Sequence, residues 1–145
     1  MPFAECAPSS GPDKEQALIN LGPGLVVLVG PPSAGDPKVP DNPQQHLALI
    51  DTGATQSCID ESLAVDLHLP LVDKVMIGGS AGAKEHNVYL AVVSAPALGC
   101  YQYGKFAGVN LAGGGQLHRV LLGRTFLAGI LLVYDGMRAQ VTLGT

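Results

Sequence analysis

The stretch HLALIDTGAT at residues 46–55 is the part of the sequence from which the fold can be argued outward. An apolar run from Leu47 to Ile50 stops at the carboxylate of Asp51, and small residues follow. A short apolar run bounded by a turn signal indicates a buried strand. Gly53 lets the backbone turn back tightly because it carries no Cβ. A carboxylate at the end of such a strand needs hydrogen-bond donors, which the backbone N–H groups of small neighbours can supply.

The composition indicates one β-rich domain. A chain of 145 residues is long enough for one substantial core. With 47% hydrophobic and 14% charged residues, 19 Gly and 11 Pro, it is typical of an all-β fold with many tight turns. The net charge of −4 and the absence of a basic run argue against nucleic-acid binding. No apolar run approaches the ~20 residues of a membrane span, and we expect no membrane partner.

The cysteines and histidines suggest no metal site. The cysteines are Cys6, Cys58 and Cys100. An odd number without metal-ligand spacing indicates free thiols in a reducing compartment, although a bridge between Cys58 and Cys100 stays open at this stage. Cys58 lies near the central stretch and could act as a nucleophile with His46 or His68 as its base, but it has no local signature. The histidines form no close-spaced ligand pair, so neither a metal nor a cofactor is predicted.

Hydrophobic patterning and turn residues predict a succession of strands with few helices. Residues 1–20 are polar and weakly patterned, and we expect a loosely ordered N-terminal arm before a domain at residues 21–145. Residues 56–68 favour a short helix capped by Ser57 or Asp60. The other expected elements are strands at 25–29, 47–50, 71–77, 87–94, 101–109, 120–122, 132–134 and 140–143, a short helix within 124–131, and glycine-rich turns at 78–82 and 112–116.

The sequence Asp-Thr-Gly-Ala at 51–54, after a Leu-Ile pair, resembles the active-site loop of aspartic proteases, and its Gly-Ala continuation is closer to the retroviral type. The order of elements over 25–143 is similar to a retropepsin monomer. The run at 121–127 and the Tyr-Asp-Gly hairpin at 134–136 look most like bacterial single-domain retropepsin-like aspartyl proteases. The resemblance implies an all-β, retropepsin-like closed β-barrel, half of a pepsin-type fold, with one or two short helices and a flap hairpin.

The resemblance also implies a site. Asp51 would be catalytic, and the active-site loop would continue through Thr52, Gly53 and Ala54. The flap and substrate-binding residues would be Ile77, Gly78, Gly79, Ser80, Ala81 and Gly82. Structural support would come from Leu122, Gly123 and Arg124. Because the sequence contains one Asp-Thr-Gly, the second aspartate would come from another copy. We therefore expect a homodimeric aspartic endopeptidase of bacterial, cytoplasmic type that hydrolyses peptides or proteins with water as the nucleophile.

One departure from the viral pattern leaves alternatives open. Viral members have an acidic residue soon after Asp-Thr-Gly-Ala that pairs with the arginine of the Gly-Arg motif. Here Thr55 or Gln56 occupies that place, so Arg124 must find another partner. The alternatives are a non-catalytic peptide-binding or scaffold domain of the same fold, and a β-barrel of unrelated function that carries the motif by chance. The candidate subsite residues are Val29, Ile77, Val120 and Leu122.

Overall fold

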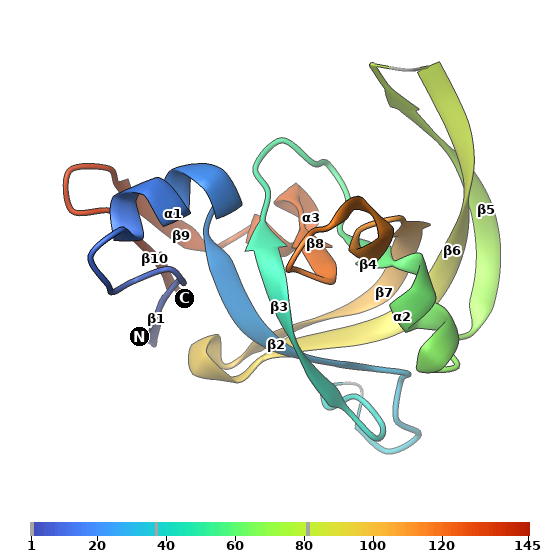
Figure 1. Ribbon diagram of the computed structural model, residues 1–145. Helices are drawn as coiled ribbons and strands as arrows, with labels where there is room; N and C mark the ends of the chain where they lie inside the picture. The colour runs from blue at the N-terminus through green and yellow to red at the C-terminus, as the bar shows by residue number, and fades with distance from the viewer. Residues whose placement is uncertain (1, 37, 81) are drawn as a thin grey trace.

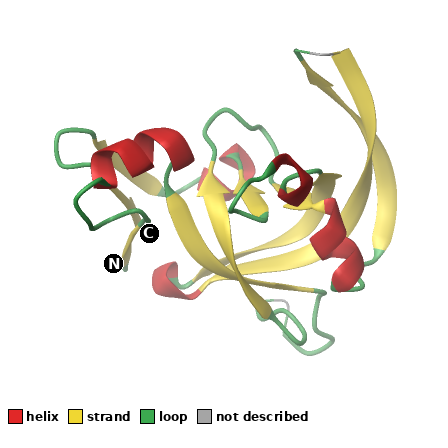
Figure 2. Ribbon diagram, viewed as in Figure 1, coloured by secondary structure: helices red, strands yellow, loops and turns green. Residues whose placement is uncertain are grey.

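The computed structural model describes residues 2–36, 38–80 and 82–145, so Ala81 of the expected flap lies outside the described residues. The chain is all-β, as predicted, with short helices around two sheets (Figures 1 and 2). The strands are β1 (Phe3–Glu5), β2 (Gly24–Gly30), β3 (Gln44–Ile50), β4 (Cys58–Asp60), β5 (Leu71–Gly79), β6 (Gly82–Ala95), β7 (Cys100–Val109), β8 (Val120–Leu122), β9 (Leu131–Asp135) and β10 (Gln140–Gly144). The helices are α1 (Lys14–Leu21), α2 (Glu61–Asp66) and α3 (Arg124–Leu127), with the 3-10 turns η1 (Pro96–Leu98) and η2 (Ala112–Gly114).

The larger sheet closes into a barrel. Its strand order is β2-β3-β8-β4-β7-β6-β5, and a further pairing of β2 with β6 joins its two sides, which leaves β5 outside the ring. Alternate side chains of these strands point inward, where β-branched and aromatic residues pack well. The fully buried side chains at the centre include Val27, Ile59, Val93, Phe106 and Leu122.

The position of β8 determines where the central stretch lies. β8 runs parallel to β3, with Ile50 opposite Leu122, and antiparallel to β4, with Ile59 opposite Val120. Because β8 lies between two strands that follow each other in sequence, the segment that joins them must cross the end of β8. This crossing brings residues 51–57 against residues 122–125. The three-residue strand β4 was not predicted, since its length gives no periodic signal.

The β5–β6 hairpin extends away from the barrel. Its strands pair from Leu71 opposite Tyr89 to Gly79 opposite Gly82. The other neighbour of β6, strand β7, pairs with it only from Val88 onward. Residues 82–87 therefore have β5 as their only strand neighbour among the described residues. Figure 1 shows this hairpin rising from the edge of the barrel. Its outer strand is exposed at every position except Ile77, which is half-buried.

The terminal segments form the second sheet, in the order β1-β10-β9. Ala4 pairs with Leu143, and both side chains are buried. Helix α1 follows, with Leu18 buried on one side. Within residues 2–20 the structure thus shows regular elements, because pairing with β10 supplies an order that three residues of sequence cannot indicate. Among the described helices, none has the length and apolar character needed to cross a bilayer.

Candidate functional site

Asp51 follows β3 directly and lies at the end of the barrel. Its N–H donates to the carbonyl oxygen of Leu122 at 3.0 Å, which continues the pairing between β3 and β8. Its Oδ1 accepts the N–H of Gly53 at 2.9 Å. A Cβ at Gly53 would lie 3.2 Å from that oxygen, so glycine permits the close contact. Asp51 is half-buried, whereas Thr52 and Gly53 are exposed. The loop thus presents a fixed carboxylate near the surface.

Arg124 holds the loop that contains Asp51. Its Nη1 donates to the carbonyl oxygen of Thr52 at 2.7 Å, and its Nη2 donates to Oγ1 of Thr55 at 2.9 Å. Its backbone N–H donates to the carbonyl oxygen of Ala54 at 2.9 Å. The guanidinium therefore finds partners in a carbonyl and a hydroxyl where the viral pattern has an acidic residue. The planar group binds two points of the loop at once, which a single ammonium cannot do.

Gly123 allows two backbone segments to approach closely. A Cβ at this position would lie 2.7 Å from the carbonyl oxygen of Gln56 and 2.8 Å from that of Ala54. The N–H of Gly123 donates to Oγ of Ser57 at 3.1 Å. Ser57 is fully buried, and its hydroxyl donates in turn to Oε1 of Gln102 on β7 at 2.8 Å. The expected supporting residues thus lie directly beneath the loop.

Asp60 is a buried hub that sequence reasoning identified only as a possible helix cap. Its Oδ1 accepts the N–H groups of Leu111 and Ala112 at 2.9 and 3.0 Å. Its Oδ2 accepts Nη1 of Arg119 at 2.8 Å and the hydroxyl of Ser62. Burial alone raises the pKa of this carboxyl, but the hydrogen bonds and the arginine outweigh burial, and the pKa is lowered. The remote partners leave no local signal in the sequence.

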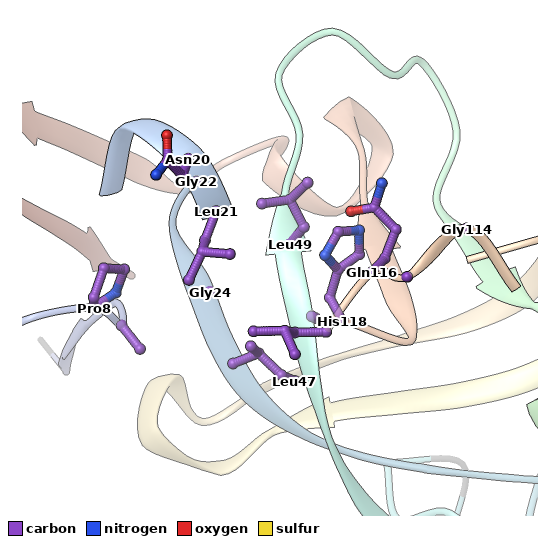
Figure 3. A pocket seen from close by; sticks show the side chains of 14 residues that line it. Pro8, Asn20, Leu21, Gly22, Gly24, Leu47, Leu49, Gly114, Gln116 and His118 are labelled. Atoms are coloured by element: carbon purple, nitrogen blue, oxygen red, sulfur yellow. The ribbon is translucent and has the colours of Figure 1, made fainter. Parts of the chain in front are cut away.

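A pocket of about 300 Å³ opens between β3, the end of α1 and the segment that leads into β8 (Figure 3). Leu47 and Leu49 line it from β3. Gly24 and Gly22 make room for these leucines, since a Cβ at either glycine would lie 2.8 Å from a leucine Cδ1. The residues around the pocket are Ala7, Pro8, Asn20, Leu21, Gly22, Gly24, Leu47, Ala48, Leu49, Gly114, Gly115, Gln116, Leu117 and His118. Its lining is mainly apolar.

His118 forms part of the pocket wall. Its side chain is 7% exposed. Burial lowers the pKa of its imidazole, and the negative charge of Asp51 partly offsets that effect. The imidazole is therefore held toward its neutral form in the folded protein.

The expected flap residues lie at the far end of the β5–β6 hairpin. Gly78, Gly79, Ser80 and Gly82 are exposed, and a Cβ at any of these glycines would meet nothing within 4 Å. Within the described ranges, no hydrogen bond joins them to the loop at 51–55. Three of the candidate subsite residues are corrected here, because their side chains fill the barrel core and reach no cleft. They are Val29, Val120 and Leu122.

The cysteine alternative is disfavoured. All three cysteines are free, so no bridge joins Cys58 to Cys100. Burial, together with the charge of Asp51, raises the pKa of the Cys58 thiol. A nucleophilic cysteine needs a lowered pKa, because the thiolate is the reactive form. In the part of the chain that the structure describes, no three His, Cys, Asp or Glu side chains gather as a group that could hold a metal ion.

Comparison with known proteins gives one broad sequence match. The profile of a family described as "Aspartyl protease" matches residues 38–126, which include both the loop at 51–55 and the Gly-Arg pair beneath it. No curated protein matches the sequence. Among solved structures, the solution structure of simian foamy virus (mac) protease is similar at 17% sequence identity and a TM-score of 0.48. The alignment covers 72% of this chain and 91% of that chain.

Proposed function

The chain belongs to the aspartyl protease family, and we propose that it is an endopeptidase whose two catalytic carboxylates are Asp51 of one copy and Asp51 of a second copy. The observation that carries this proposal is the setting of Asp51. It stands half-buried at a strand end, fixed by the Gly53 N–H, in a loop that Arg124 holds from below. A reactive carboxylate needs this combination of access and fixed geometry.

The proposed chemistry divides acid and base roles between two carboxyl groups. Held about 3 Å apart, the two groups cannot both ionise easily, so one of them stays protonated. The ionised carboxylate takes a proton from a water molecule, and the oxygen of that water attacks the peptide carbonyl carbon. The protonated carboxyl group donates its proton to the carbonyl oxygen. The carboxyl group that took the proton from water then donates it to the amide nitrogen, while the other carboxylate removes a proton from a gem-diol hydroxyl. The C–N bond breaks to give a carboxylic acid and an amine, and the carboxyl pair returns to its starting protonation. No covalent enzyme intermediate forms.

The second carboxylate is assigned to a second copy for two reasons. The sequence carries one Asp-Thr-Gly. Within the described chain, Oδ2 of Asp51 receives no hydrogen bond, and the exposed Thr52 and Gly53 beside it leave that side open to a partner. With a two-fold axis between the two Asp51 side chains, the loop of one subunit would contact the same loop of the other subunit. Thr52 would then form a hydrogen bond across that axis.

The proposed substrate is an extended peptide held between the flap and the barrel. The β5–β6 hairpin, with its tip at residues 77–82, would cover the peptide as an added strand and exclude water. Val75 and Met76 on this hairpin are 41% and 59% exposed and point to opposite faces of the ribbon, so bound peptide would cover one of them. The pocket lined by β3, the strand that Asp51 follows, would take one substrate side chain. Its Leu47 and Leu49 favour an apolar or aromatic group.

The non-catalytic alternative loses part of its support. It drew on the missing acidic partner of Arg124, but the contacts to Thr52 and Thr55 hold the loop without that acid. A scaffold domain would also have no need of a half-exposed carboxylate at the site. We further propose a reducing, cytoplasmic compartment of bacterial type, because all three cysteines are free thiols.

Replacing the proposed catalytic group tests the enzyme assignment. Asp51→Asn should lower the rate of peptide hydrolysis by roughly a thousandfold or more, since it removes the acid–base pair. The far-UV circular dichroism and the unfolding midpoint should stay close to those of the wild type. Asp66→Asn, at an exposed end of α2, is the matched control and should leave the rate unchanged. An Asp51→Asn protein as active as the wild type would remove the proposal.

Mixing the two proteins tests whether the pair is shared. Wild-type and Asp51→Asn chains are combined in varied proportions and allowed to exchange subunits before the rate is measured. If both carboxylates are needed, the rate should follow the square of the wild-type fraction, because only wild-type pairs are active. A linear dependence would show that each chain works alone. Analytical ultracentrifugation on the same mixtures gives the dimer population, and a monomer at all concentrations would favour the non-catalytic reading.

A further inference from the structure

The β5–β6 hairpin leaves the barrel at a defined point. β6 loses its second strand neighbour below Val88, where its pairing with β7 ends opposite Ala107. Beyond that point, residues 73–79 and 82–87 form a two-stranded ribbon. A ribbon of two strands is marginally stable by itself, so its angle to the barrel depends on side-chain contacts near its base. Two ion pairs reach this ribbon, Lys74–Glu85 between its own strands and Lys105–Asp73 from β7, but all four side chains are more than half exposed and both pairs contribute little.

A stronger contact lies at the base itself. Oε1 of Glu61, the first residue of α2, accepts Nδ2 of Asn87 at 2.9 Å and the hydroxyl of Tyr89 at 2.5 Å. Both donors are on β6, one on each side of the position where the pairing with β7 ends. Tyr89 is 5% exposed. Burial, and next the hydrogen bond to Glu61, raise the pKa of its phenol, so the hydroxyl stays a donor.

The structure around Glu61 keeps its carboxylate at this place. Its neighbour Asp60 is bound by backbone groups of the 111–112 segment and by Arg119, so the start of α2 cannot shift easily. Gly108 of β7 leaves the space in which the carboxylate lies, since a Cβ there would lie 1.9 Å from Oε2 of Glu61. The carbonyl oxygen of Gly108 also contacts Nδ1 of His86 at 2.8 Å. A fixed helix and a glycine gap thus position one acceptor for the hairpin base.

We propose that Glu61 is a positioning residue that joins the base of the β5–β6 hairpin to α2 and so sets how far the hairpin opens over the site. The claim about the joint rests on the contacts of Asn87 and Tyr89 alone, and its consequence for catalysis rests on the proposed function. Glu61 does not touch the reacting atoms. It acts through β6, because its contacts with Asn87 and Tyr89 lie where the pairing of β6 with β7 ends and the free ribbon begins. Nothing in the aspartic-protease loop itself requires a carboxylate at this position.

Loss of the joint should affect substrate capture more than bond cleavage. The two hydrogen bonds to the charged Glu61 acceptor together contribute at least about a factor of ten to the local equilibrium. Without them, the closed position of the hairpin should be less populated, and the apparent affinity for substrate should fall by the same factor. The carboxylate pair lies on other elements, so its chemistry should change little.

The experiment compares Glu61→Ala with Glu85→Ala on the intact protein. Glu85 is on the same hairpin but pairs only with Lys74 on the adjacent strand, so it is the matched control. In Glu61→Ala, we expect amide hydrogen exchange of residues 74–87 to rise roughly tenfold, with β3 and β8 unchanged. KM for a peptide substrate should rise by a similar factor, with kcat within about twofold. Glu61→Gln keeps the acceptor oxygen and should restore most of the protection.

Each outcome decides one claim. Unchanged exchange over residues 74–87 in Glu61→Ala overturns the joint, whatever the activity of the protein. If hydrogen exchange rises in Glu61→Ala but the wild-type protein cleaves no peptide, the joint is supported and the proposed function is removed. If Glu61→Ala does not fold, Asn87→Ala removes one of the two donors at a half-buried site and should raise exchange by a smaller factor. Exchange in Asn87→Ala equal to that of Glu85→Ala would also overturn the joint.

Discussion

Two regions of this molecule differ in how they are held. The loop at 51–57 is fixed from several directions, by the backbone of Leu122, by the side chains of Arg124 and Ser57, and by the close approach of Gly123. The hairpin at 73–87 is held by its own strand pairing and by contacts at its base. Gly123 lies where the backbone of the loop meets the segment beneath it, whereas a Cβ at Gly78, Gly79 or Gly82 of the hairpin would meet nothing within 4 Å.

The difference shows how one small barrel can meet two opposed demands. A carboxylate that must meet its partner within about 3 Å needs a rigid setting, since small displacements cost large factors in rate. A segment that admits and covers a peptide must move, and such segments have few buried contacts. The dense contacts lie beneath Asp51, and the sparse ones lie along the hairpin. Substitutions in the two regions should therefore differ in their effects on stability and on catalysis.

The largest loss of stability is expected at Asp60, which follows the fixed loop at the end of β4. Asp60→Asn removes the charge that faces Arg119 and turns an acceptor for two backbone N–H groups into a poorer one. Breaking one side of a buried ion pair costs about 3–5 kcal/mol of unfolding free energy. Urea unfolding at neutral pH measures this loss, and Asp13→Asn at the surface is the control.

The same carboxyl predicts a pH dependence with a defined sign. Because the folded pKa of Asp60 lies below its ordinary value of 3.8, the unfolded chain binds a proton at higher pH than the folded one. The stability from Asp60 is therefore complete above about pH 5 and declines as the pH falls through about 4 toward the folded pKa. The difference in stability between wild type and Asp60→Asn should narrow over that range. A constant difference from neutral to acid pH would contradict the assignment.

Gly123→Ala should have the next effect. Its Cβ would lie 2.7 Å from a backbone oxygen of the loop, and the backbone cannot rotate away as a side chain can. We expect a loss of about 1–3 kcal/mol in unfolding free energy, as for other overpacked sites. Peptide hydrolysis should fall with it, since Asp51 would shift. A variant with wild-type stability would show that the loop and the Gly-Arg segment are not in close contact.

Arg124→Lys should give a smaller loss, with activity as the more sensitive measure. The ammonium can reach the Thr52 carbonyl or the Thr55 hydroxyl but cannot span both. We expect a decrease of about 1 kcal/mol in unfolding free energy for one lost contact. The control is Arg138→Lys, which lies in the exposed turn after β9, pairs with Asp135 three residues earlier, and should leave stability close to that of the wild type. Equal effects at the two arginines would contradict the anchoring role.

The smallest effect is expected at the hairpin tip. A Cβ at Gly78 would meet nothing within 4 Å, so Gly78→Ala should change the unfolding free energy by less than about 0.5 kcal/mol. Its effect should instead appear as a changed KM, because the tip would contact bound peptide. Gly78→Ala and Gly123→Ala make the same chemical change in the two regions, so their effects on stability can be compared directly. Similar losses of stability at the two glycines would remove the contrast.

The sequence predicted the elements that carry strong local patterns. The apolar run before Asp51, the strand at 120–122 and the glycine-rich hairpin lie where periodicity and turn residues placed them. It missed β1 and β4, each three residues long, because such strands exist only through their partners. The subsite candidates Val29, Val120 and Leu122 were wrong because a fully apolar strand residue can face a cleft or a core with the same local pattern.

By itself, then, the sequence determined the all-β class, the carboxylate at a strand end and the glycine-arginine pair, since these depend on residue type and short-range spacing. The tertiary structure alone decided that β8 lies between β3 and β4, and hence that Arg124 reaches Thr52 and Thr55. It also decided the partners of Asp60 and Glu61. The physical reason is that these contacts join segments far apart along the chain, and only the closure of the barrel brings their atoms within hydrogen-bonding distance.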